Sequence, residues 1–123
     1  MAAAELIVDA QNAVGESPVW VPEHNALYWV DIPAKQILRW NAHDGAVFSW
    51  TGPEMLGCVA HIKDDRWLAA AVSGVFSVKL LDNGGMHTEP FASASHASTG
   101  MRFNDGRCDR QGRLLAGTMF MDM

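Results

Sequence analysis

The chain has 123 residues, of which 49% are hydrophobic, and its formal net charge at pH 7 is −5. The length is that of one ordinary domain, and the hydrophobic content excludes a disordered chain. The acidic balance, without a basic cluster, excludes nucleic acid and anionic membrane surfaces as partners.

The start of the chain and its cysteines indicate a compartment. Met1 to Asp9 lacks a basic segment, and acidic residues interrupt its apolar run, so a signal peptide is not expected. No apolar stretch is long enough to span a bilayer. Cys58 and Cys108 have no Cys-x-x-Cys spacing, and we expect two small core residues in a reducing compartment. The sequence therefore predicts a cytoplasmic protein without membrane partners.

The first part of the chain reads as a set of short strands. Apolar runs over 27–32 and 36–40 follow a polar turn, and Asp44-Gly45 predicts a hairpin into the run 47–50. No convincing helical period is present. We expect one four-stranded unit over about 16–50.

The rest of the chain repeats this layout. A second unit is expected over about 57–90, with a turn at 82–85, and a third over about 102–123. Between them, 91–101 is rich in small residues and is expected to be a loop between units. Such insertions usually lie at the end of a repeat where binding occurs.

Aligning the units gives a repeat. Tyr28 corresponds to Leu68, 40 residues later, and Leu68 corresponds to Leu115, 47 residues later. Four short strands at this spacing are typical of the blades of a β-propeller. A small β-sandwich, which also has many short strands and regular turns, is the alternative.

About two and a half blades do not close a ring, because propellers use roughly four to eight. The chain is therefore expected to be the N-terminal part of a longer protein or a truncated product that stops at Met123. Open sheet edges would then favour self-association.

Three polar residues are the candidate site. Glu16 lies 12 residues before Tyr28, and Asn104 lies 11 before Leu115, so both open the innermost strand of a blade. Arg102 is two residues from Asn104 and is expected to face the same channel. Carboxylate and amide oxygens suit Ca²⁺, Mg²⁺ or Mn²⁺, and a carboxylate also binds Zn²⁺.

Structural explanations for the same residues stay open. Glu16 could be a turn residue before Pro18, and Arg102 and Asn104 could form a salt bridge and an Asx turn. The five histidines show no metal spacing and are expected mainly at the surface, whereas the tryptophans are expected in the blade cores. Asp31, at a strand end, is expected to cap a turn.

Several short motifs occur together and in order. They are Gly15-Glu16-Ser17-Pro18, Leu27-Tyr28-Trp29-Val30-Asp31-Ile32, Gly74-Val75, Arg102-Phe103-Asn104-Asp105-Gly106, Asp109, Gly112-Arg113 and Ala116-Gly117-Thr118-Met119. With these motifs the chain resembles the senescence marker protein 30, gluconolactonase and luciferin-regenerating enzyme family, which includes regucalcin. The resemblance covers nearly the whole chain.

The resemblance implies an all-β, six-bladed β-propeller with one divalent metal in its channel, here as an incomplete N-terminal part. It implies that Glu16 binds the metal and that Arg102 and Asn104 contact the substrate. Further metal ligands and the catalytic base are implied beyond Met123. A substrate-binding glutamate of the family has no counterpart in Phe120-Met121-Asp122, which puts that contact in doubt.

The leading functional hypothesis is metal-dependent hydrolysis of a sugar lactone, in which a divalent metal (Ca, Zn, Mg or Mn) acts as a Lewis acid. The 123-residue chain alone is expected to be inactive, because it carries one presumed metal ligand. The alternatives are a non-catalytic calcium-binding protein, like regucalcin, and an inactive fragment.

Overall fold

The computed structural model describes residues 3–96 and 99–122 and contains ten strands and one short 3-10 helix. In chain order they are β1 (Gly15–Val21), η1 (Pro22–His24), β2 (Ala26–Asp31), β3 (Gln36–Asn41), β4 (Val47–Thr51), β5 (Leu56–Lys63), β6 (Arg66–Ala71), β7 (Gly74–Leu80), β8 (Met86–Ser93), β9 (Met101–Cys108) and β10 (Leu114–Phe120). Within the described ranges, no helix is long and apolar enough to cross a membrane.

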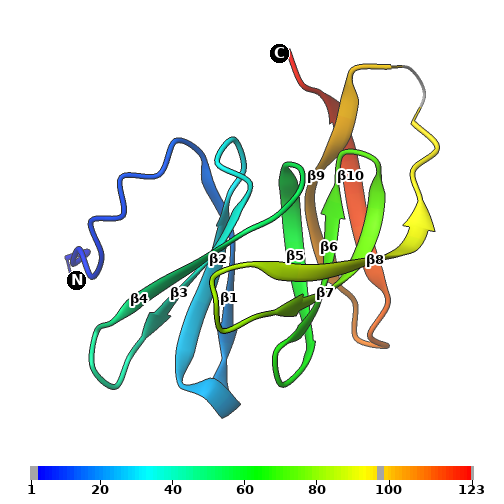
Figure 1. Ribbon diagram of the computed structural model, residues 1–123. Coiled ribbons are helices and arrows are strands. Elements are labelled where there is room, and N and C mark those ends of the chain that lie inside the picture. The colour runs from blue at the N-terminus through cyan, green and yellow to red at the C-terminus, as the bar shows by residue number, and fades with distance from the viewer. Residues whose placement is uncertain (1–2, 97–98, 123) are drawn as a thin grey trace.

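The strands form three separate antiparallel sheets, each built from chain neighbours. The sheets have the orders β1-β2-β3-β4, β5-β6-β7-β8 and β10-β9. Figure 1 shows them side by side, and the first strands β1, β5 and β9 contact one another. The predicted all-β fold is confirmed, and its form is an incomplete propeller rather than the alternative sandwich.

The three sheets differ slightly in their bounds from the expected units. The first two sheets span residues 15–51 and 56–93, and the third spans 101–120. β8 therefore continues through the first three residues of the segment expected to be a loop over 91–101. Positions 97, 98 and 123, which belong to the expected loop and third unit, lie outside the described residues.

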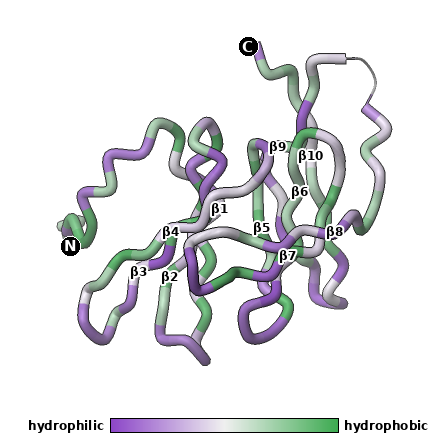
Figure 2. Tube along the Cα trace, viewed as in Figure 1, coloured by the Kyte–Doolittle hydropathy of each residue, from purple (hydrophilic) through white to green (hydrophobic). Residues whose placement is uncertain are grey.

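The core lies between the first two sheets. Along β2 the side chains of Ala26, Tyr28 and Val30 are buried, as the period of two in a strand requires. They pack in one cluster with Trp67 and Val78 of the second sheet. Figure 2 shows hydrophobic residues mainly along the strands and hydrophilic ones concentrated in the turns. Burying each large side chain stabilises the fold by about 2 kcal/mol.

A glycine sets how closely the second and third sheets approach. A Cβ added to Gly57 of β5 would lie 2.3 Å from the carbonyl oxygen of Phe103 and 2.6 Å from that of Asn104. Real Cβ atoms do not approach oxygen so closely, so only glycine allows the backbones of β5 and β9 to meet here.

Candidate functional site

The strand register places three residues at equivalent positions of the three inner strands. The partners of Tyr28, Leu68 and Leu115 across the first strand pair of each sheet are Val19, Ala60 and Arg107. Three residues before these partners stand Glu16, Gly57 and Asn104. Two of the three positions therefore carry polar side chains, and the middle one carries none.

Glu16 and Asn104 line the same cavity. It has a volume of about 750 Å³ and lies between the inner strands β1, β5 and β9. Arg102 is not part of its lining and touches the wall through Asn104. The structure thus brings two of the three predicted site residues to one hollow and sets the third behind it.

A buried carboxylate holds the chain segment that precedes Glu16 in place. Asp31 is 6% exposed, and its oxygens accept hydrogen bonds from the backbone N–H groups of residues 13 and 14 at 3.2 and 3.0 Å. The Asn12 amide also donates to Asp31, at 3.3 Å, and accepts from the Trp29 indole at 2.7 Å. Asp31 therefore anchors the segment that leads into Glu16, which extends the predicted turn-capping role.

The residue after Glu16 has an unusual backbone. Ser17 has φ +58°, a left-handed conformation disfavoured for a non-glycine residue and for one that precedes proline. It lies in a β-bulge of β1, and its hydroxyl accepts a hydrogen bond of 3.2 Å from the N–H of Val59 on β5. This bond ties the first inner strand to the second beside Glu16.

Asn104 is oriented by its neighbour. A guanidinium nitrogen of Arg102 donates to the Asn104 amide oxygen at 3.1 Å and to the Phe103 carbonyl at 2.9 Å. Because a guanidinium only donates, the amide oxygen of Asn104 faces Arg102 and its NH₂ group is left to donate. Asn104 is therefore suited to bind an acceptor oxygen of a ligand.

Sequence reasoning missed other residues of the cavity wall. Asp105 and His61 line it, as do Trp20 and Cys108. Trp20 is 48% exposed, so its placement in a blade core was wrong. Cys108 was predicted to lie in the core but is exposed, so that prediction was wrong. The same prediction is confirmed for Cys58, which is buried, and burial raises the pKa of its thiol to about 11.

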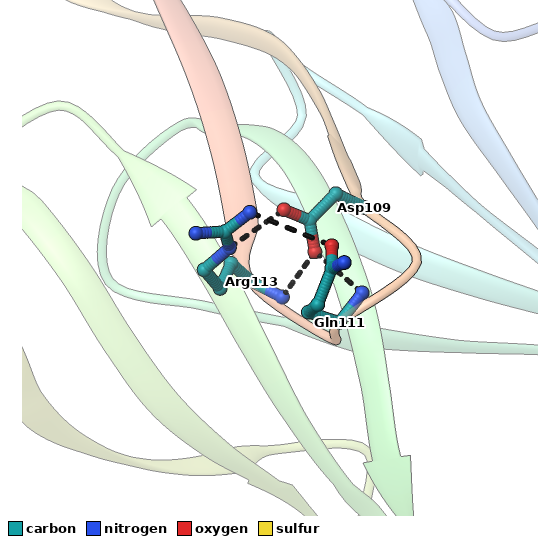
Figure 3. A network of polar contacts seen from close by, with 3 residues as sticks. All are labelled: Asp109, Gln111 and Arg113. Carbon is teal, nitrogen blue, oxygen red and sulfur yellow. Dashed lines mark hydrogen bonds and ion pairs between the residues drawn. The ribbon is translucent and has the colours of Figure 1, made fainter.

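Three polar residues of the β9–β10 turn have a structural role. Figure 3 shows Asp109 accepting from the Arg113 side chain at 2.7 Å and from the backbone N–H groups of Gln111 and Arg113 at 2.9 Å each. These bonds, led by the backbone N–H of Arg113, lower the pKa of Asp109. This motif therefore shapes the turn that joins β9 to β10.

The donor set does not complete a site for a divalent metal. The part of the chain that the structure describes holds no group of three or more His, Cys, Asp or Glu residues arranged for an ion. In the cavity wall Glu16 and Asp105 each offer a carboxylate and His61 an imidazole. The Asn104 oxygen, by contrast, is engaged by Arg102. Ca²⁺ takes six to eight oxygen ligands, so these residues alone do not fit one.

We therefore expect the 123-residue chain to bind Ca²⁺ weakly, with a dissociation constant above about 1 mM. Isothermal titration calorimetry of the chain with CaCl₂ measures this directly. Stoichiometric binding in the micromolar range would contradict the expectation, and loss of that binding in Glu16→Gln would locate it.

The chain is similar in sequence to proteins of one known family. Residues 14–123 match the model of the SMP-30/Gluconolactonase/LRE-like region. The chain is 37% identical to 6-deoxy-6-sulfogluconolactonase of Pseudomonas putida, 30% to regucalcin of Danio rerio and 32% to L-arabinolactonase of Azospirillum brasilense. These alignments cover 93%, 97% and 93% of this chain but only 38%, 39% and 37% of those proteins.

Two solved structures have a similar fold. The crystal structure of a calcium-binding protein, regucalcin, from Agrobacterium tumefaciens superposes with a TM-score of 0.87 at 25% identity, over 98% of this chain and 40% of that one. A luciferin-regenerating enzyme superposes with a TM-score of 0.83 at 22% identity, over 90% of this chain and 38% of that one. The chain thus spans about two fifths of the length of the proteins it matches.

Proposed function

Because the chain belongs to the SMP-30/Gluconolactonase/LRE-like family, we propose that it forms one wall of the channel of a sugar lactonase. One observation carries the proposal: Glu16 and Asn104, from equivalent positions of two sheets, line one cavity. Relatives named as sugar lactonases support the substrate class.

In this proposal Asn104 binds the substrate directly, and Arg102 acts on it through its hydrogen bond to Asn104. A lactone ring offers only acceptor oxygens at its ester group, and the free NH₂ of Asn104 is a matching donor. Hydrolysis places negative charge on the carbonyl oxygen. The Arg102 cation, hydrogen-bonded to Asn104, favours that charge through the amide dipole.

Glu16 is proposed as one ligand of a divalent cation, Ca²⁺, Zn²⁺, Mg²⁺ or Mn²⁺. Its carboxylate is exposed on the cavity wall, and oxygen donors suit these ions. The described residues do not complete the ion's coordination, so no catalytic step is assigned to it or to a general base among them.

The second candidate is calcium binding without catalysis. It is favoured by the likeness to the calcium-binding protein from Agrobacterium tumefaciens and by relatives named regucalcin. Both candidates use Glu16, but only lactone hydrolysis requires Asn104 to donate to a substrate oxygen.

The test joins residues 14–123 to the remainder of the Pseudomonas putida relative, in place of its matching segment. We expect a folded chimera to hydrolyse D-glucono-δ-lactone with added divalent metal. Glu16→Gln should abolish the metal-dependent turnover, and Asn104→Ala should lower kcat/KM about 100-fold, as loss of a single polarising donor does.

Glu23→Gln, an exposed carboxylate of η1, is the matched control and should leave turnover unchanged. Circular dichroism and a cooperative melt establish that each chimera is folded. Full activity in folded Glu16→Gln would overturn the role of Glu16. Calcium binding without any lactone hydrolysis by the folded chimera would favour the second candidate.

A further inference from the structure

Two histidines meet at the junction between the first and second sheets. His24 of η1 and His61 of β5 have ring centroids 5.2 Å apart. His24 hydrogen-bonds the Tyr28 hydroxyl at 2.8 Å, and the His61 ring packs 4.9 Å from buried Trp67. Tyr28 and Trp67 lie 4.6 Å apart, so each sheet contributes one histidine and one large aromatic residue to the contact.

The hydrogen bond of His24 suits a neutral imidazole. Burial raises the pKa of Tyr28, so its hydroxyl keeps its proton and can donate to the Nδ1 lone pair of His24. The Nε2 of His61 lies 2.9 Å from the Asp64 carbonyl, an acceptor only, so this nitrogen is the donor and holds the His61 ring in place.

Protonation of His24 conflicts with its surroundings. Nδ1 would become a donor, and the Tyr28 hydroxyl would have to turn its own hydrogen elsewhere. The Arg39 guanidinium, 5.5 Å from the Tyr28 ring centre, offers the hydroxyl only donors. A charged His24 would also face the Arg39 cation and, at 5.2 Å between ring centroids, the His61 ring.

We propose that this junction is an acid-sensitive lock, which holds the first two sheets together while His24 is neutral and weakens when His24 takes up a proton.

Some groups around His24 lower its pKa and others raise it, and the net effect is a lowered pKa. Burial is the main cause that lowers the pKa of His24 below its ordinary 6.5, followed by His61 and Arg39. The carboxylates Glu23 and Asp64 oppose this shift.

The sign of the pH dependence follows from this shift. In the unfolded chain His24 titrates at the higher, ordinary pKa, so the unfolded state binds more protons as the pH falls. The stability that neutral His24 contributes is complete above 6.5 and declines as the pH falls from there through the folded pKa.

The lock lies in the wall of the candidate site. His61 lines the cavity that contains Glu16, whereas His24 lines a second hollow of about 550 Å³ between the first two sheets. Separation of these sheets would move β1 relative to β5, and with it Glu16 relative to the opposite wall. Acid would therefore loosen the cavity before the individual sheets unfold.

Urea unfolding of the 123-residue chain at about pH 7.5 and about pH 5.5 tests the lock. The urea concentration at the midpoint of unfolding should be lower at about pH 5.5 than at about pH 7.5 for the wild type. His24→Gln keeps an acceptor for Tyr28 but does not titrate, so the decrease in its midpoint should be at most half as large. His43→Gln, an exposed turn residue, is the matched control and should keep the full wild-type decrease.

A fall of equal size in wild type and His24→Gln would overturn the proposal. If His24→Gln does not fold, the imidazole C–H resonances of the wild type decide by NMR. A His24 resonance that titrates below 6.5 is the expected result, and one that titrates at or above 6.5 would also overturn it.

Discussion

Replacing Gly57 by alanine is expected to destabilise the protein by about 3 kcal/mol. The new Cβ would lie 2.3 Å and 2.6 Å from two carbonyl oxygens of β9, those of Phe103 and Asn104. Both neighbours are backbone atoms, so no rotamer change relieves the overlap. β9 must move away from β5, and Asn104 must move with it out of register with Glu16.

Gly117→Ala is the matched control for this substitution. Within the described residues, a Cβ at Gly117 meets no atom within 4 Å, and its backbone is not left-handed. We expect this variant to be neutral or up to about 1 kcal/mol more stable, because alanine restricts the unfolded chain. Urea unfolding compares the two, and equal stabilities would show that β5 and β9 are not in close contact at Gly57.

Truncation of Trp67 to alanine is expected to destabilise the protein by about 4 kcal/mol. Trp67 is fully buried and packs against Tyr28 of the first sheet and His61 of its own sheet. Its removal would leave a cavity at the junction between the sheets. Guanidinium or urea denaturation measures the loss.

Trp67→Phe separates packing from hydrogen bonding. Among the described residues the buried Nε1 of Trp67 has no hydrogen-bond partner, and an orphan donor itself costs about 1–3 kcal/mol. Phenylalanine keeps an aromatic ring against Tyr28 and removes this donor, so we expect less than half the loss seen with alanine. Similar losses in both variants would contradict the view that the indole N–H is unsatisfied.

Much of the fold could be predicted from the sequence because strand signals are local. Short apolar runs between turns, with the turn at Asp44-Gly45, predicted the first sheet, and the spacing of Glu16 and Asn104 from their partner strands predicted a shared cavity. The equivalent Gly57 was overlooked, although it lies 11 residues before Leu68, because a glycine carries no side-chain chemistry.

Contacts between sheets could not be predicted from the same patterns. The His24–His61 pair joins residues 37 positions apart, and no local period reports it. Trp20 and Cys108 were misassigned because apolar character does not reveal which side of an inner strand faces the channel. The roles of Glu16, Arg102 and Asn104 in metal and substrate binding stay predictions.

The sheet orders have a consequence for how the chain acquires its fold. Within each sheet the strands pair only with strands next to them in sequence, so each sheet forms by closing short loops at little entropic cost. Contacts this local favour rapid formation. During synthesis the residues of the first sheet leave the ribosome before those of the second, so β1 to β4 can pair first and offer Trp67 a surface to pack against when it emerges.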